Sequence, residues 1–325
     1  MDKKDLRIVY MGTPDFAVPT LEKLIDTGYD IVGVVTMPDK PIGRHQNQLQ
    51  ASPVKQCALR HGIPVLQPEK LKDETFLTNL RALHADLQIV VAFRMLPEVV
   101  WDMPRLGTFN LHAALLPQYR GAAPINWAII NGDTQTGITT FFLDHDIDTG
   151  KVIRQEAIPI GPDDNAEDVH DRLMMLGADL VCQTVHDICN GTIHPIPQEQ
   201  MTTSRPLRPA PKIFRDTCQI HWDRHTAQTA HNFVRGLSPY PGAWTNATLP
   251  DGRETTIKIL ATKVTDTHTS HDTGGTALFT SQDNRLLVRM PGGTLEITQL
   301  QVAGKKRMTA SDFLNGTDIH GWSLA

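Results

Sequence analysis

The sequence predicts an α/β protein: a doubly wound, largely parallel sheet followed by a second, smaller domain that is a β-barrel. Strand-like apolar runs alternate with amphipathic helical runs from residue 6 to residue 143, as βαβ units require. Prolines then mark residues 194–211 as an extended linker, and short alternating runs follow it. A chain of 325 residues is long for one core, so we expect domains at 1–193 and 212–325.

The elements of the first domain follow from local signals. A buried strand is expected at residues 6–11, and the turn Gly12–Asp15 ends it. Thr13 can cap the helix that follows, and Gly28 stops that helix. A polar, proline-broken segment occupies residues 37–50. The same reasoning places strands at 29–36, 63–66, 87–92, around 109–112 and at 138–143, and helices at 53–60, 74–83, 124–130 and 166–189.

The second domain shows the two-residue period of half-buried antiparallel strands. Gly, Pro, Asn and Asp turns separate the runs, which is typical of a small barrel. Strands are expected at 244–249, 254–264, 286–290 and 294–302, with one helix near 226–235.

Composition and charge limit the classes of function. Hydrophobic residues make up 40% and charged residues 21% of the chain, which fits a folded globular protein. The first apolar run, residues 8–11, is too short for a signal peptide or a membrane helix. We therefore expect a cytoplasmic protein with no membrane partner.

Charge and cysteine usage add two expectations. From Leu207 onward there are 13 basic and 10 acidic side chains, a net of +3, against −8 before Leu207. A mildly basic second domain hints at a polyanionic partner. The four cysteines show no CxxC spacing, so we expect them to be reduced; they are Cys57, Cys182, Cys189 and Cys218.

The stretch FNLHAALLPQYRG, residues 109–121, places polar side chains where a strand ends. Because side chains alternate along a strand, Asn110 and His112 share one face, and Phe109 and Leu111 share the other. Ligands bind at the carboxyl ends of strands in open α/β sheets. We expect these two side chains, the Arg-Gly loop after them and the Asp-rich loop after the next strand to converge at one edge of the sheet.

The sequence lacks the motifs of several common nucleotide, metal and nucleophile sites. The chain has no GxGxxG and no P-loop, which argues against a dinucleotide or ATP site. The segment Asp144–Gly150 has Asp at alternate positions, but Thr149 and Gln155 stand where an EF-hand needs Gly and Glu. His112 and His145 lack the spacing of zinc ligands, so we expect no metal. A GxSxG nucleophile elbow is absent too.

An asparagine, a histidine and a carboxylate suit acyl transfer without a covalent intermediate. An amine is already a good nucleophile when neutral, so the protein needs only to position the reactants, stabilise an oxyanion and move a proton. Asn110 and a protonated His112 would be the oxyanion donors. A nearby carboxylate would raise the pKa of His112 and could take a proton through water.

The same stretch, continued as FNLHAALLPQYRGAAPINWAI, resembles the signature of the folate-dependent formyltransferases. That signature pairs N-x-H with a later Asp in a D-T-G or D-G-G turn, and here the Asp is Asp148. The likeness runs from VYMGTPDFAVPTLEKL through PDKPIGR, IDTG and RGLSPYPGAW to GKKRMTASDFLNG. The chain is similar over nearly its full length to those members of the family that formylate the methionine carried by initiator tRNA.

This resemblance implies formyl transfer from 10-formyltetrahydrofolate to the α-amino group of that methionine, for translation initiation. It also implies a Rossmann-like catalytic domain and an OB-like, tRNA-binding barrel. Asn110 and His112 would hold the formyl oxygen, and Asp148 would keep His112 charged. The residues that would line the folate pocket are Arg94, Met95, Leu96, Ala114, Leu115, Leu116 and Pro117.

For tRNA, Arg44 matches a loop arginine of the family that reaches toward the acceptor end. Lys305, Lys306 and Arg307 form a basic cluster in the barrel, for which phosphate contact and simple solvation are both open. We expect a monomer that binds initiator methionyl-tRNA and folate and uses no metal.

Two alternatives stay open. An N-formyltransferase for amino-sugar nucleotides would share the Asn, His and Asp set and a two-domain layout, but would need neither PDKPIGR nor a basic barrel. A non-catalytic tRNA-binding protein of the same fold would have no reason to keep Asn110, His112 and Asp148 together.

Overall fold

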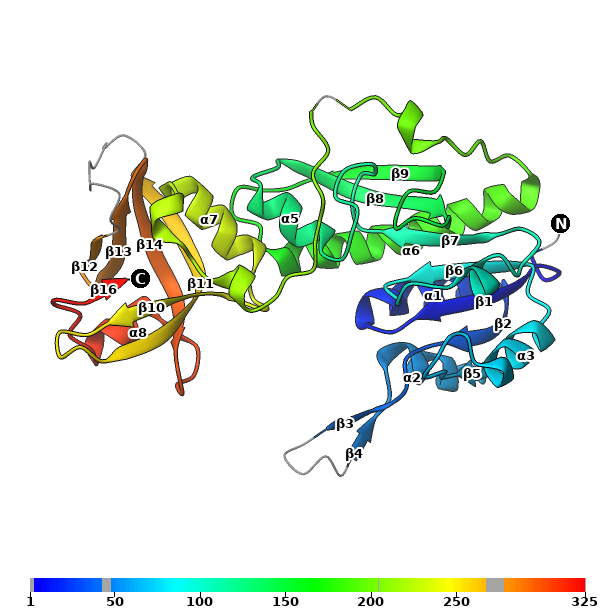
Figure 1. The fold of residues 1–325 in the computed structure, drawn as a ribbon, viewed down its shortest axis with the longest axis horizontal. Helices are drawn as coiled ribbons and strands as arrows, with labels where there is room; N and C mark the ends of the chain where they lie inside the picture. Colours follow the sequence, from blue (N-terminus) through cyan, green and yellow to red (C-terminus); the bar gives the residue numbers. More distant parts are fainter. Residues whose placement is uncertain (1–2, 43–47, 204, 267–277, 325) are drawn as a thin grey trace. The chain divides into compact units, whose positions relative to one another are not determined.

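The computed structural model describes residues 3–42, 48–203, 205–266 and 278–324 (Figure 1). Contacts divide the chain into two compact units, each built from more than one segment. The first unit comprises Met1–Gly121, Gly137–Ile158 and His170–Pro209; the second comprises Ala122–Thr136, Pro159–Val169 and Ala210–Ala325. The domain limits at 193 and 212 stay a prediction, and the two units are described separately below.

A seven-stranded sheet lies at the centre of the first unit, in the order β5-β2-β1-β6-β7-β8-β9 (Figure 1). The first five strands in this order, β5, β2, β1, β6 and β7, pair in parallel, and β8 pairs with β7 antiparallel. The predicted doubly wound, largely parallel sheet is confirmed. Strand β9 was missed because its sequence, VIRQEAIP, is polar and half-exposed at the sheet edge. The bounds are β1 (Arg7–Gly12), β2 (Asp30–Val35), β5 (Val65–Leu66), β6 (Leu87–Val91), β7 (Thr108–His112), β8 (Gln135–Phe142) and β9 (Val152–Pro159).

Helices α2, α3 and α6 begin where the local signals predict, α4 was not predicted, and the start of α1 needs a correction. Ser52 caps its helix by accepting from the Lys55 N–H at 3.1 Å. Thr13 caps nothing: the 3₁₀ turn Asp15–Ala17 follows it, and the Thr13 hydroxyl accepts from Thr36 at 3.5 Å instead. Among the described residues, no helix is long and apolar enough to cross a membrane. The bounds are α1 (Val18–Asp26), α2 (Pro53–Arg60), α3 (Glu74–Ala82), α4 (Glu98–Trp101) and α6 (Ala166–Asn190), the last reaching into the first unit from the second.

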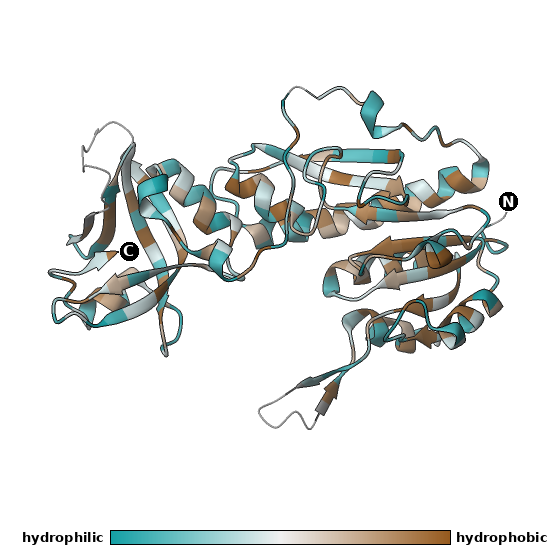
Figure 2. Ribbon diagram, viewed as in Figure 1, coloured by the Kyte–Doolittle hydropathy of each residue, from teal (hydrophilic) through white to brown (hydrophobic). Residues whose placement is uncertain are grey.

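Apolar residues gather on the central strands of the first sheet (Figure 2). All five residues of β6 are buried. Gly12, at the end of β1, has no room for a side chain, because a Cβ there would lie 2.8 Å from the Ala17 Cβ and 2.9 Å from the Val91 carbonyl oxygen. A glycine is therefore required for the close approach of β1, β6 and the following turn.

A two-stranded antiparallel ribbon forms within the segment predicted to be polar and proline-broken. Its strands are β3 (Lys40–Ile42) and β4 (Gln48–Gln50). Lys55 of α2 holds the approach to this ribbon by donating to Asp39 at 2.6 Å. Arg44 falls between the two strands and lies outside the described residues.

The second unit is built on an antiparallel sheet in the order β12-β13-β14-β11-β10-β16, with β15 paired to β14. The strands at the two ends of this order, β12 and β16, are in contact, so the sheet curls as the predicted barrel requires. Strands β12, β15 and β16 and helix α8 were not predicted, because each is short and lacks a clear period. The bounds are α5 (Pro124–Ile130), α7 (Ala227–Gly236), β10 (Ala243–Thr248), β11 (Glu254–Asp266), β12 (Leu278–Gln282), β13 (Arg285–Met290), β14 (Gly293–Val302), β15 (Met308–Thr309), α8 (Ala310–Asn315) and β16 (Ser323–Leu324).

Helix α7 ties earlier parts of the chain into the second unit. The Asn126 side chain of α5 donates to the Gly236 carbonyl oxygen at 2.7 Å. The buried Arg235 guanidinium donates to the Asp164 carbonyl oxygen at 2.8 Å. These contacts explain why two segments that precede the linker pack with the C-terminal residues.

Candidate active site

The carboxyl ends of β1, β6 and β7 lie next to one another at one edge of the first sheet. After β2 and β5, the chain crosses back and places β6 on the other side of β1, so the strand order reverses between β1 and β6. This kind of switch point is where open α/β sheets bind ligands. The backbone turns sharply after β6, where Ala92 has φ +48°. His112 is the last residue of the neighbouring strand β7.

Asn110 and His112 occupy alternate positions of β7 and therefore share one face of the strand. Asn110 pairs in register with Phe141 of β8, and His112 pairs with Thr139. His112 is only 5% exposed, whereas Asn110 is half-buried. The pair thus combines a carboxamide within reach of solvent with an imidazole that is shielded from it.

Two groups flank the His112 ring. Its Nε2 lies 2.8 Å from the Tyr119 carbonyl oxygen, which can only accept, so Nε2–H donates. In the neutral ring this leaves a lone pair on Nδ1. Nδ1 lies 3.9 Å from Asp148 Oδ2. The ring is therefore oriented by a backbone carbonyl on one side and faces a carboxylate on the other.

Burial lowers the pKa of His112 below its ordinary value, and the Asp148 carboxylate and the Tyr119 carbonyl offset this only in part. This direction is opposite to the rise in pKa expected from the Asp148 carboxylate. The role of Asp148 in keeping His112 charged stays a prediction. The sequence places a carboxylate near the ring, but it does not reveal that burial outweighs it.

Asp148 reaches His112 from a loop that starts at the other end of β7. Because β8 runs antiparallel to β7, the Leu143 N–H donates to the Thr108 carbonyl oxygen, and the chain then folds back. Asp148 has φ +56°, and its Oδ2 accepts from the Gly121 N–H at 2.8 Å. Gln198 donates to the Asp148 carbonyl oxygen at 2.8 Å. These bonds hold the carboxylate beside the ring in a backbone conformation that non-glycine residues seldom adopt.

The segment Ala114–Pro117, predicted to line the folate pocket, follows β7 directly. Ala114, Leu116 and Pro117 are buried, and Leu115 is half-buried. Thr139 donates to the Ala114 carbonyl oxygen at 2.6 Å and accepts from the Leu116 N–H at 3.1 Å. Since these backbone groups are already bonded within the chain, folate contacts through this segment would use its remaining atoms.

The second predicted folate segment, Arg94–Leu96, follows β6. Met95 is 74% exposed, and Leu96 is buried. The Arg94 guanidinium donates to the carbonyl oxygens of Pro68 and Glu69, so it is turned toward that neighbouring loop. Its Nε is buried without a hydrogen-bond partner.

The predicted tRNA-binding residues of the second unit lie in the turn between β14 and β15. Lys305, Lys306 and Arg307 are all exposed. The Arg307 guanidinium donates to the Gln299 side-chain oxygen. The structure thus leaves both lysine ammonium groups at the surface and braces the arginine against the barrel.

Two family models match the chain. The model described as formyl transferase matches residues 6–185, and the model described as formyl transferase, C-terminal domain, matches residues 212–318. Together they cover well over half of the chain. The chain belongs to the formyltransferase family.

Curated relatives resemble this formyltransferase over nearly its whole length. The methionyl-tRNA formyltransferase of Parabacteroides distasonis is 59% identical over 97% of each chain. The protein of the same name from Bacteroides fragilis is 58% identical over 97% of this chain and 96% of its own.

Solved structures share the fold at much lower identity. WlaRD, a sugar 3N-formyltransferase, aligns with a TM-score of 0.62 at 19% identity, covering 93% of this formyltransferase and 99% of WlaRD. HypX from Aquifex aeolicus, solved with tetrahydrofolic acid, aligns with a TM-score of 0.61 at 16% identity, covering 97% of this chain and 48% of HypX. At these identities the likeness concerns the fold alone.

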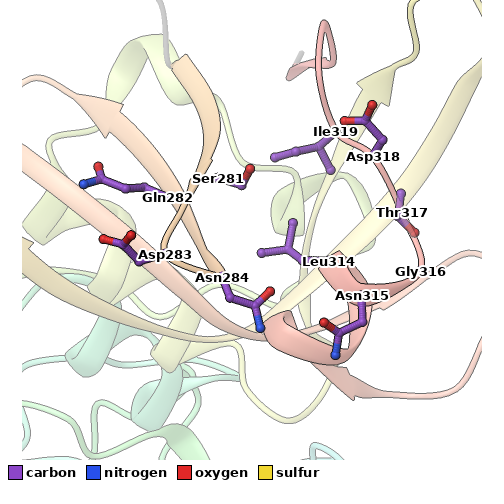
Figure 3. Close-up of a pocket in the computed structure, with 10 residues that line it drawn as sticks. All are labelled: Ser281, Gln282, Asp283, Asn284, Leu314, Asn315, Gly316, Thr317, Asp318 and Ile319. Atoms are coloured by element: carbon purple, nitrogen blue, oxygen red, sulfur yellow. The ribbon is translucent and has the colours of Figure 1, made fainter.

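A cavity of about 590 Å³ opens in the second unit, and none of the predicted site residues lines it. It is lined by Ser281–Asn284, from the turn between β12 and β13, and by Leu314–Ile319, around the end of α8 (Figure 3). Asp283 and Asp318 place two carboxylates in this wall. A cavity with this charge disfavours phosphate, so we assign it no part in tRNA binding.

The sequence did not reveal the residues that orient His112 and Asp148. Tyr119 and Gly121 act through backbone atoms, which leave no side-chain signal. Gln198 lies in the predicted extended linker, which in fact contains a 3₁₀ turn at Gln198–Gln200 and a bridge from Ile196 to Val152. No motif marks that glutamine, although Arg120 also donates to its side-chain oxygen.

Proposed function

We propose that this chain transfers the formyl group of 10-formyltetrahydrofolate to the α-amino group of methionine on initiator tRNA, producing formylmethionyl-tRNA for translation initiation. The observation that carries this proposal is the full-length likeness, at 58–59% identity, to relatives named methionyl-tRNA formyltransferase. The Asn110, His112 and Asp148 set supplies a mechanism for it.

In the first step the neutral amine attacks the formyl carbon. An α-amino group titrates near pH ~8, so part of it is neutral at physiological pH without help from the protein. As negative charge develops on the formyl oxygen, the half-buried Asn110 carboxamide donates an N–H to it. The protein therefore needs no nucleophile of its own.

His112 moves the proton. Its Nδ1 lone pair takes a proton from the attacking nitrogen, and the Asp148 carboxylate at 3.9 Å and the Tyr119 carbonyl oxygen stabilise the resulting imidazolium. The bond between the formyl carbon and N10 of the folate then breaks as the new amide forms. The proton passes to N10, so His112 returns to its neutral form and the protons balance.

The binding surfaces belong to the same proposal. Arg94–Leu96 and Ala114–Pro117 would line the folate pocket, Arg44 would reach the acceptor end of tRNA, and Lys305–Arg307 would contact tRNA phosphates. The protein would act as a monomer in the cytoplasm, where translation takes place.

The choice of acceptor tests the proposal. The chain is incubated with 10-formyltetrahydrofolate and either charged initiator tRNA or a dTDP-linked amino sugar, and the product that gains the formyl group is identified by mass spectrometry. Formylated methionyl-tRNA is the expected product. Formylation of the amino sugar alone would favour the sugar nucleotide alternative, and tRNA binding without formylation of either acceptor would favour a non-catalytic role.

A further inference from the structure

Glu22, Cys57 and His61 form a cluster in the first unit that plays no part in the mechanism above. Cys57 and His61 are four residues apart on α2 and its C-cap, so their side chains lie on one side of that helix. Glu22 comes from α1, which packs against α2. One potential ligand atom from each residue, a sulfur, a ring nitrogen and a carboxylate oxygen, lies within 4.8 Å of the other two.

The hydrogen bonds of the cluster leave its ligand atoms facing one another. His61 Nε2 lies 2.7 Å from Glu22 Oε2, and the Arg60 guanidinium donates to the other carboxylate oxygen, Oε1, at 2.7 Å. Arg60 thus holds Oε1 of the carboxylate, and Oε2 faces the His61 ring. The Glu22 and His61 side chains are 30% and 31% exposed, whereas Cys57 is fully buried. The cluster is therefore open to solvent on one side and closed by the thiol on the other.

We infer that Glu22, Cys57 and His61 bind a zinc ion. Zinc prefers nitrogen, sulfur and oxygen ligands of this kind, and the Cys-x₃-His spacing on one helix presents two of them together. Ligand atoms about 2.0–2.3 Å from a tetrahedral zinc ion lie roughly 3–4 Å apart, so side-chain shifts of about 1 Å would close the cluster around an ion. Water would complete the four ligands.

Binding exchanges a proton for the ion. Burial raises the pKa of the Cys57 thiol to about 12, so without an ion the sulfur stays protonated. When the zinc–sulfur bond forms, that proton leaves to solvent, and Arg60 continues to hold the second oxygen of Glu22.

The ion would fasten α1 to α2, whose other end contacts the approach to the β3–β4 ribbon. Helix α2 already anchors that approach, because its cap Ser52 bonds to Thr36 at 2.8 Å and Lys55 pairs with Asp39. The proposed site differs from the metal sites weighed in the sequence because Glu22 is 35 residues before Cys57 and joins it only through the packing of two helices.

Cobalt(II) is a suitable probe, because thiolate-to-cobalt charge transfer reports a metal–sulfur bond directly. The full chain is freed of metal with a chelator, kept reduced and titrated with Co²⁺, while near-ultraviolet and visible absorption are followed. We expect one Co²⁺ per chain with a charge-transfer band, which Zn²⁺ then removes. Cys57→Ser should abolish the band, and His61→Gln should weaken Co²⁺ affinity at least about tenfold.

Cys189→Ser is the matched control, since Cys189 is a half-buried cysteine of α6 outside the cluster, and it should keep the band. His61 is exposed, so His61→Gln should fold even if Cys57→Ser does not, and circular dichroism checks both. Formyl transfer should be unchanged in His61→Gln, which separates this site from the proposed function. The absence of a charge-transfer band in the wild type, or its survival in folded Cys57→Ser, would overturn the inference and leave a cluster of hydrogen bonds and ion pairs.

Discussion

Replacing Asp148 with asparagine removes the negative charge that faces His112 while keeping the size of the side chain. The asparagine oxygen can still accept from the Gly121 N–H, which now bonds Asp148 Oδ2 at 2.8 Å. The loop should therefore keep its position. What changes is the stabilisation of the imidazolium that forms when His112 takes the proton of the attacking amine.

The size of the effect follows from the geometry. Two unit charges 3.9 Å apart attract each other by about 4 kcal/mol at an effective dielectric constant of about 20. The His112 and Asp148 side chains are 6% and 14% exposed, so solvent and salt screen this attraction little. If the ring carries between half and all of its positive charge in the transition state, the rate should fall by about 30-fold to about 10³-fold.

The assay is single-turnover formylation of charged initiator tRNA with both substrates saturating, so that binding does not enter the rate. Asp146→Asn is the matched control, because it removes one negative charge from an exposed position of the same loop. It should change the rate less than about twofold. An Asp148→Asn enzyme as fast as Asp146→Asn would refute the role of the carboxylate.

Three further predictions concern proton transfer, tRNA binding and stability. The lowered pKa of His112 favours the neutral ring above pH 6.5. The single-turnover rate, after correction for ionisation of the amine, should therefore stay level as the pH rises above 6.5. A falling rate would mean that the protonated ring is needed. Changing Lys305 and Lys306 to alanine should weaken tRNA binding and leave folate affinity unchanged. The slope of log binding constant against log salt concentration should fall by roughly the contribution of one to two phosphate contacts. An unaltered slope would mean that both lysines are simply solvated. Arg235→Ala should lower the free energy of unfolding by about 2–3 kcal/mol in urea titrations, because the Asp164 carbonyl oxygen loses the charged donor that the buried Arg235 supplies; a loss below about 0.5 kcal/mol would contradict that.

The sequence predicted helices well where a capping residue or an N-terminal proline stands at the start of a run with helical hydrophobic period. The helices expected at 53–60 and 124–130 match α2 and α5, since each begins with proline and the first has a serine cap. The direction of β8 could not be read in the same way. A strand, a helix and a strand usually form a parallel unit, but β8 follows α5 and runs antiparallel to β7.

The sequence predicted that Asn110, His112 and Asp148 meet, but it did not predict the direction of the His112 pKa shift. The strand period alone placed Asn110 and His112 together, and the family resemblance added Asp148. The lowered pKa of His112 comes from burial by distant parts of the chain, which no local pattern encodes. Tyr119 and Gln198 were missed for a related reason, because one acts through its backbone and the other comes from the linker.

The most direct test of the central claim is the single-turnover rate of formyl transfer by His112→Ala, measured beside the affinities of the same protein for folate and for charged initiator tRNA. We expect a rate at least ~10²-fold below that of the wild type, the scale for losing a group that acts in the transition state, with both affinities within about twofold. A wild-type rate in a correctly folded His112→Ala protein would contradict the claim that the side chains at the end of β7 carry out the reaction.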